Sequence, residues 1–177
     1  AMADLGLDML PTLYLRYDQQ QGRIILNGAE DLDRLVAAGL SGPLPVAGGN
    51  AIAGIYREMT PGAQRAPHWK IDHLPPVAFY RKVTEAFEGL ERERRERGWP
   101  ELICCPLDEV DASRADFGAR VYKAVRDGGI RTYITKNPLA ADAAVYGPGV
   151  DIWCSQPYSM PYDKIIAQDR FEYWSLS

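Results

Sequence analysis

Two adjacent carboxylates, Asp108 and Glu109, follow the apolar segment 102–107 and precede a segment with a helical pattern. A strand that leads into a helix ends at the carboxyl edge of a parallel sheet, where α/β folds and barrels place their chemistry. Two acids in different surroundings can divide the work of hydrolysis, because one stays ionised while the other stays protonated as a general acid. A structural role is the alternative, since acidic residues also favour the positive end of a helix dipole.

The second half of the chain alternates strand-like and helix-like segments. Strands are expected at residues 102–107, 131–135, 151–155 and 171–175. Apolar residues at helical spacing predict a helix over Ser113–Asp127, with Ser113 as its N-cap and Gly128-Gly129 at its end. Shorter helical segments are expected at Leu139–Ala144 and Tyr162–Asp169. Strands that alternate with helices indicate βαβ units and a parallel sheet.

The first half continues this pattern less regularly. Strands are expected at residues 13–17 and 43–48, with a hairpin excursion over residues 18–26. A helix capped by Asn27 is expected near Ala29–Ala38, and the longest helix at Val77–Arg97. The segment Gly48–Pro76 between them is rich in Gly, Pro, His and Trp. A loop of this length is either functional or contains structure that the pattern does not show.

These segments predict a single α/β domain over residues 1–177, with about six strands in βα order. A closed eight-stranded barrel usually takes about 250 residues, so the domain is either an open sheet or an incomplete barrel. We favour an incomplete (β/α)8 barrel of the TIM type, expected as a piece of a larger glycosidase-like protein. Its exposed sheet edges would favour a homo-oligomer or edges covered by the termini.

Composition and charge exclude several classes of function. The net charge of −4 leaves no basic stripe for nucleic acid, and no apolar run approaches the roughly 18 residues of a membrane span. The three cysteines are expected to be reduced and buried, and His68 and His73 lack the spacing of a zinc site. Gly48-Gly49 lacks a following helix pattern, so no phosphate-binding glycine loop is expected. We therefore expect no metal and no cofactor, and the cellular compartment stays open.

From about Trp99 to Trp174 the chain resembles the catalytic domain of glycoside hydrolase family 123 and its relatives. The resemblance rests on Asp108-Glu109 after Cys105-Pro106-Leu107, on the segment 123–133, on Val150-Asp151-Ile152-Trp153 and on Glu172-Tyr173-Trp174. The first hundred residues match less closely. Proline commonly follows the acid pair in that family, whereas this chain has Val110.

The resemblance implies a (β/α)8 barrel that hydrolyses N-acetyl-β-galactosaminides by substrate-assisted retention. The 2-acetamido oxygen of the sugar then acts as the nucleophile, which is an exception to the two-carboxylate rule of glycosidases. Carried onto this chain, Asp108 would orient the acetamido group, and Glu109 would protonate the leaving oxygen and later activate water. Adjacent acids are also too close for a direct inverting pair, whose carboxyl groups stand about 6.5–9.5 Å apart.

Aromatic and polar residues near the strand ends are the candidates for carbohydrate binding, because sugar rings stack on flat side chains. They are Trp153, Gln156, Tyr158 and Trp174, together with His68 and Trp69 in the long loop. Core packing is an alternative for each aromatic residue, and above all for Trp153, which lies between Ile152 and Cys154. Lys136 follows a predicted strand and could contact sugar hydroxyls.

Two other functional classes remain open from the sequence. One is a non-catalytic carbohydrate-binding or structural domain that keeps the βα pattern without turnover. The other is a flavodoxin-like module in which strand-end acids bind a metal or receive phosphate. That module expects its acid pair after the first strand, whereas Asp108-Glu109 follow a strand in the middle of the chain.

Overall fold

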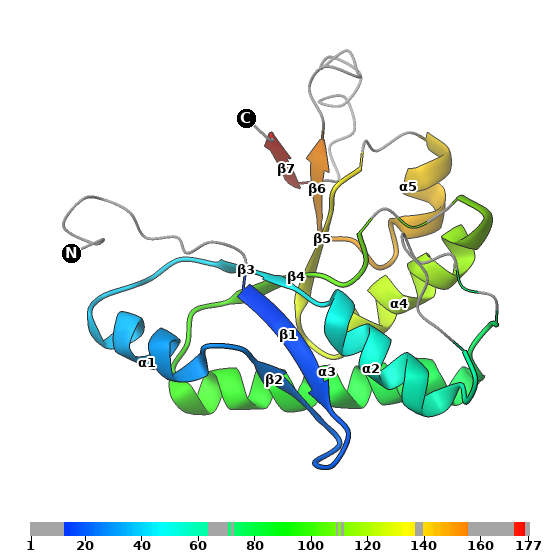
Figure 1. The fold of residues 1–177 in the computed structure, drawn as a ribbon. Helices are drawn as coiled ribbons and strands as arrows, with labels where there is room; N and C mark the ends of the chain where they lie inside the picture. Colours follow the sequence, from blue (N-terminus) through cyan, green and yellow to red (C-terminus); the bar gives the residue numbers. More distant parts are fainter. Residues whose placement is uncertain are drawn as a thin grey trace.

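The computed structural model describes residues 13–63, 71, 73–108, 110, 112–136, 140–155 and 172–175. Its centre is a seven-stranded sheet in the order β2-β1-β3-β4-β5-β6-β7 (Figure 1). The strands are β1 Leu13–Asp18, β2 Arg23–Leu26, β3 Leu44–Ala47, β4 Leu102–Cys105, β5 Arg131–Ile134, β6 Ile152–Ser155 and β7 Glu172–Ser175. The β1–β2 pair is antiparallel, and every other neighbouring pair is parallel.

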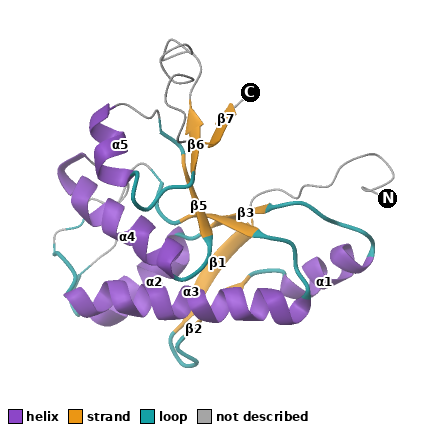
Figure 2. Cartoon of the chain, turned by 180° about the vertical axis from the view of Figure 1, so that it is seen from behind, coloured by secondary structure: helices purple, strands orange, loops and turns teal. Residues whose placement is uncertain are grey.

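Helices connect most of the parallel strands. They are α1 Ala29–Ala37, α2 Gly49–Met59, α3 Val77–Arg97, α4 Ala115–Asp127 and α5 Ala140–Tyr146, with the short 3₁₀ helix η3 Ala112–Arg114 before α4. The view from behind shows the long helix α3 running past α2 and α4 on one side of the sheet (Figure 2). Contacts of α3 with α2, α4 and β2 agree with this arrangement. Within the described residues, no helix combines the length and the apolar character that crossing a bilayer requires.

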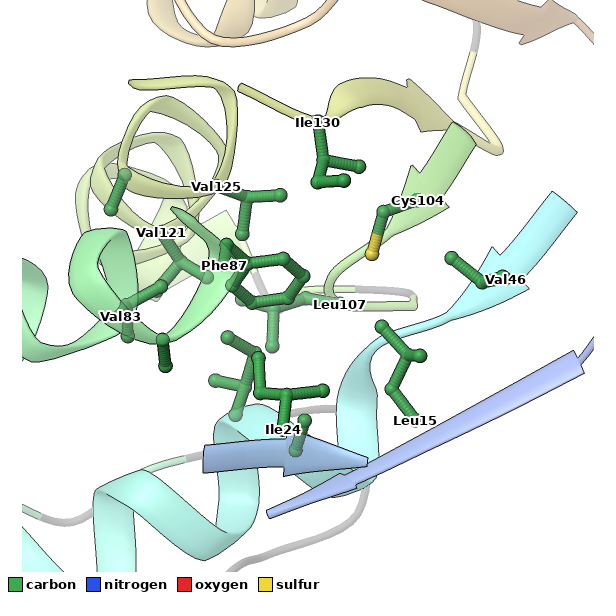
Figure 3. Close-up of a cluster of buried hydrophobic side chains, with 14 of the residues drawn as sticks. Leu15, Ile24, Val46, Val83, Phe87, Cys104, Leu107, Val121, Val125 and Ile130 are labelled. Atoms are coloured by element: carbon green, nitrogen blue, oxygen red, sulfur yellow. The ribbon is translucent and has the colours of Figure 1, made fainter. Parts of the chain in front are cut away.

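The main hydrophobic core lies between the sheet and these helices. Alternate residues of each strand point to opposite faces, so Leu15, Val46 and Cys104 reach the helix-covered face. There they meet α3 and α4 side chains such as Phe87 and Val121 (Figure 3). Burying each large apolar side chain contributes roughly 1.5–3 kcal/mol, so this layer supplies most of the favourable free energy of folding.

A second, smaller apolar cluster lies on the opposite face of the sheet. It consists of the buried residues Ile103, Ile152 and Cys154, with the half-buried Tyr133 packed against them. Strand β1, which β3 separates from β4, instead exposes Tyr14, at 56%, and Arg16 on that face. The two faces therefore differ, and only the helix-covered face carries the continuous core.

The predicted βα order is confirmed. All six predicted parallel strands are present within one or two residues of their expected ends, and the expected hairpin after β1 forms through β2. The structure shows a mixed α/β fold with a mostly parallel sheet. Among the described strands β2 and β7 are the two edges, so a closed barrel is not shown.

The prediction that no helix follows Gly48-Gly49 was wrong, because α2 begins at Gly49. Gly48 is needed there for close packing: a Cβ atom at this position would lie 2.8 Å from Sγ of Cys104. Its N–H also donates to the carbonyl of Cys105, at 2.8 Å, which ties the start of α2 to the end of β4. A Cβ at Gly54 would likewise lie 2.7 Å from Cβ of Tyr17, so α2 packs directly on β1.

Two predicted helix caps also differ from the structure. The N-cap of α1 is Gly28, at φ 80°, rather than Asn27, since only glycine adopts this left-handed turn without strain. The N-cap of α4 is Arg114, because Ser113 is taken up in η3. Helix α3 has the predicted bounds, and α5 extends the expected single turn to Tyr146. The predicted helix at Tyr162–Asp169 lies outside the described residues.

Candidate functional site

The end of β4 is held in place from the helix side. All residues of β4 are buried, and so are Pro106 and Leu107 after it. Asp108 is the first exposed residue that follows the strand. The hydroxyl of Tyr122 on α4 donates to the carbonyl of Leu107 at 2.8 Å. Sγ of Cys105 lies 3.6 Å from the same carbonyl. The backbone just before Asp108 is therefore anchored by two side chains.

Asp108 is joined to the neighbouring strand. Oγ1 of Thr135, the residue after β5, donates to Oδ1 of Asp108 at 3.0 Å. Because β4 and β5 are parallel neighbours, their carboxyl ends meet at one edge of the sheet. The bond fixes one carboxylate oxygen of Asp108 and leaves Oδ2 without a partner among the described residues. The residue is exposed, so this second oxygen is accessible to a ligand.

A small pocket lies beside this contact. It has a volume of about 170 Å³ and is lined by Leu107, Val110, Ile134, Thr135, Lys136 and Tyr146. The aliphatic side chains and the Tyr146 ring make most of its wall apolar, whereas Thr135 and Lys136 supply polar groups. Such a pocket is large enough for a small substituent but not for a sugar ring together with its neighbours.

Lys136 is the cation that lines this pocket. Its Nζ lies 2.9 Å from Oδ1 of Asp142 and 5.6 Å from the ring centre of Tyr146. Both partners belong to α5, so they hold the lysine at the pocket. Burial, with a smaller contribution from the Asp142 charge, raises the pKa of Tyr146 to about 12. The phenol therefore stays neutral and acts as a hydrogen-bonding and packing group.

The cysteines near the site are not suited to nucleophilic chemistry. Burial is the main reason that the pKa of Cys105 rises to about 12, although the Tyr122 hydroxyl opposes the shift. Cys104 is fully buried, and burial likewise raises the pKa of its thiol above the ordinary value. A thiol attacks as its thiolate, so these side chains are inert at neutral pH. Their role is to pack between the sheet and the helices.

Most of the sequence-predicted site residues, among them the catalytic candidate Glu109, lie outside the described residues. These are Glu109, His68, Trp69, Gln156 and Tyr158. Trp174 belongs to β7, and its Cα is paired in register with that of Cys154. Among the described residues, the structure thus shows Asp108 at the carboxyl edge of β4.

Trp153 requires a correction as a sugar-stacking residue. Its side chain is 0% exposed and belongs to the main core cluster on the helix-covered face. A ring without exposed surface has no face to offer to a sugar, so the packing alternative holds for this residue. The flanking residues Ile152 and Cys154, which point to the opposite face, are buried as well.

Sequence reasoning missed Thr135 as a partner of Asp108 and Tyr122 as the anchor of its strand end. Thr135 could have been found, because the ends of consecutive parallel strands share one edge of the sheet. Tyr122 has no comparable signal, since its position matches an ordinary buried helix residue. Among the described residues, no three His, Cys, Asp or Glu side chains gather in a way that could hold a metal ion.

Comparison with known proteins adds no relative: no family model, curated protein or solved structure matches the chain.

Proposed function

We propose that this chain forms part of a glycoside hydrolase that cleaves N-acetyl-β-hexosaminides, specifically N-acetyl-β-galactosaminides, by substrate-assisted retention. The observation that supports this most directly is the placement of Asp108. It is an exposed carboxylate at the carboxyl edge of a parallel sheet, and one of its oxygens is fixed by Thr135. The motif around Asp108-Glu109, which resembles glycoside hydrolase family 123, points to the same chemistry.

The sheet is compatible with a sector of a (β/α)8 barrel. Strands β1 and β3–β7 are parallel neighbours in chain order, as they are in such a barrel, and helices lie in the connections from β1 to β6. In barrel enzymes the catalytic groups lie at the carboxyl ends of the strands, where Asp108 is found. The antiparallel strand β2 is an addition next to β1.

In the proposed mechanism the free oxygen of Asp108 accepts the acetamido N–H of the substrate. This orients the acetamido carbonyl oxygen, which forms a bond to the anomeric carbon as the glycosidic C–O bond breaks. Glu109 gives its proton to the leaving oxygen, and an oxazolinium intermediate results. Glu109 then takes a proton from the water that opens this intermediate and regenerates the sugar.

The test uses the complete polypeptide that carries these residues, with an aryl N-acetyl-β-galactosaminide as substrate. Glu109→Gln should lower kcat by about 10²–10⁴, the usual contribution of a general acid, and leave sugar binding largely intact. Asp108→Ala should be nearly as damaging, because the internal nucleophile loses its orienting partner. The plain aryl β-galactoside serves as the control substrate.

Three outcomes would contradict the proposal in different ways. Equal turnover of the two aryl sugars would exclude acetamido participation. Full activity of either variant would remove that residue from the mechanism. Binding of the sugar without turnover of any glycoside would favour a non-catalytic carbohydrate-binding domain, the alternative that also fits an exposed acid at a sheet edge.

A further inference from the structure

Lys136 lines the small pocket at the carboxyl ends of β4 and β5, and the proposed glycosidase mechanism does not use this lysine. The pocket has a volume of about 170 Å³, and its other lining residues are Leu107, Val110, Ile134, Thr135 and Tyr146. Four of these five side chains are aliphatic or aromatic. Lys136 therefore brings a primary amine into a mostly apolar pocket.

Two residues of α5 hold this amine in place. Nζ of Lys136 lies 2.9 Å from Oδ1 of Asp142 and 5.6 Å from the ring centre of the buried Tyr146. Helix α5 lies next to α4 and is in contact with it (Figure 2). The side chain of a lysine is otherwise flexible, so these two contacts restrict the amine to the pocket.

The surroundings of Lys136 differ from those of another lysine that has the same kind of partner. Lys123 on α4 forms an ion pair with Asp127 at 2.7 Å, and the two side chains are 57% and 49% exposed. The side chains of Lys136 and Asp142 are only 34% and 23% exposed. The two pairs are thus alike in chemistry, but the pair at the pocket is more shielded from water.

We propose that Lys136 forms an imine with a small aldehyde or ketone that enters this pocket. The lysine amine is one of the groups through which proteins form covalent intermediates with carbonyl compounds. A water molecule occupies about 30 Å³ in the liquid, so the pocket accommodates a molecule of about four to six non-hydrogen atoms. The proposal rests on the pocket and does not depend on the glycosidase function.

The walls of the pocket favour a short and neutral carbonyl compound. Leu107, Val110 and Ile134 offer aliphatic contacts to an alkyl chain. The carboxylate of Asp142 disfavours a second carboxylate beside it, because like charges repel each other. Propanal has the expected size and character, whereas the aromatic ring of benzaldehyde makes that aldehyde too large.

The reaction is a condensation in which Asp142 carries the protons. Its carboxylate takes one proton from Nζ of Lys136, and the amine then attacks the carbonyl carbon, so that a C–N bond forms and the carbonyl electrons move to oxygen. A second proton of the amine passes by way of Asp142 to this oxygen, which becomes a hydroxyl. The C–O bond breaks as Asp142 protonates the hydroxyl, and water leaves. The resulting iminium ion keeps the positive charge of the ammonium, and Asp142 is ionised again.

The experiment traps the imine in the 177-residue chain with propanal and sodium cyanoborohydride. The hydride reduces an imine to a stable secondary amine, and peptide mass spectrometry then measures how fast each lysine gains a propyl group. Lys123 serves as the reference in the same sample. Lys136 should react at least about tenfold faster than Lys123, because the pocket holds the aldehyde next to its amine. With benzaldehyde the ratio of the two rates should fall to about one.

Two variants separate the roles of the acid and of the pocket. Asp142→Asn removes the proton carrier and should slow the labelling of Lys136 by about 10²-fold. Asp127→Asn is the matched control, because it removes the equivalent acid beside Lys123 and should leave Lys136 unchanged. Val110→Phe fills the pocket from a half-buried position and should lower the rate of Lys136 toward that of Lys123.

Three outcomes would overturn the proposal. Equal rates of Lys136 and Lys123 with propanal would show that the pocket gives no advantage. The same ratio with propanal and benzaldehyde would show that the aldehyde does not bind in the pocket. Faster labelling in Asp142→Asn would show that Asp142 only keeps the amine protonated. None of these measurements involves the turnover of a glycoside, so they are independent of the test of the glycosidase function.

Discussion

The hydrogen bond between Thr135 and Asp108 is the contact on which the candidate site depends at the level of single residues. It spans two strands and orients a carboxylate that otherwise projects into solvent. An exposed carboxylate rotates freely unless it is held, and a freely rotating group contributes little to catalysis. The hydroxyl of Thr135 is therefore expected to position Asp108 rather than to stabilise the fold.

Thr135→Val tests this role, since valine keeps the shape of threonine and removes the hydroxyl. We expect kcat on the aryl N-acetyl-β-galactosaminide to fall about tenfold, the effect of losing one hydrogen bond of roughly 1–1.5 kcal/mol. The midpoint of thermal unfolding should change little, because the contact is exposed. Thr135→Ser restores the hydroxyl and should recover most of the activity. Loss of activity in the serine variant as well would mean that Thr135 acts through its packing.

The sequence predicts the role of a single residue only where the residues next to it in the chain indicate its surroundings. Asp108 was found because an apolar strand ends immediately before it. Trp153 was misplaced among the sugar-binding candidates, because strand alternation alone does not tell which face the helices cover.

At the level of elements, helix α3 carries an ion pair near its end that is shielded from solvent, between Glu91 and Arg94. The Glu91 side chain is 12% exposed. Its carboxylate accepts hydrogen bonds from Nε and a terminal nitrogen of Arg94, at 2.7 and 2.8 Å. Arg94 also donates to the carbonyl of Trp99 at 2.8 Å, so the pair anchors the end of α3 to the entry of β4. Arg97 and Nε1 of Trp99 both bind Asp33, each at 2.7 Å, which ties α1 to the same corner.

The Glu91–Arg94 pair predicts a specific dependence of stability on pH. The hydrogen bond from Arg94 is the largest cause that lowers the pKa of Glu91 below its ordinary value of 4.5. A lowered pKa in the folded state stabilises the protein above the pKa of the unfolded chain, and this contribution disappears as pH falls through the folded pKa. The free energy of unfolding should therefore decrease as pH drops below about 4.5.

Glu91→Gln isolates this contribution. It should cost about 1–2 kcal/mol at pH 7, as measured by urea unfolding, and the variant should lose less stability than the wild type between pH 5 and pH 3. Glu85→Gln is the control, because Glu85 forms a more exposed pair with Arg81 on the same helix. Parallel pH profiles for the wild type and Glu91→Gln would contradict the assignment.

The helix α2 shows where element prediction failed. Its sequence begins with two glycines, which normally indicate a turn, and its buried face is made of small and mixed residues such as Ala51 and Ala53. Gly48 allows α2 to start against β4, and Gly54 allows it to pack on β1 at close range. Such a requirement is set by tertiary contacts, and the periodicity of one segment does not contain it.

At the level of the whole molecule, the order of the parallel strands was predictable. From β1 to β6 each strand is separated from the next by a turn or a helix, and consecutive parallel strands lie side by side. Closure of the sheet was not predictable, because it depends on contacts between strands at its two ends. Among the described strands, β2 and β7 are those ends and do not pair with each other.

An open parallel sheet predicts self-association of the isolated chain. Edge strands offer unpaired N–H and C=O groups, and Tyr14 is an exposed aromatic side chain on β1. We expect the sedimentation coefficient of the 177-residue chain to rise with protein concentration in the micromolar range. Ile25→Lys in the edge strand β2 should reduce the rise, whereas Glu96→Lys on α3 should not. A constant monomer over the whole range would contradict the prediction.

Chemical labelling of the three buried cysteines can measure how often parts of the folded protein unfold locally. All of them are free and buried, in strands β4 and β6, and burial raises the pKa of each thiol. An alkylating reagent consumes only accessible thiolates, so it modifies the closed protein very slowly. Labelling at a given site then proceeds at the frequency with which the packing around that thiol opens. Comparison of Cys104 with Cys154 would thus show whether the centre of the sheet and its β6 side open together or independently.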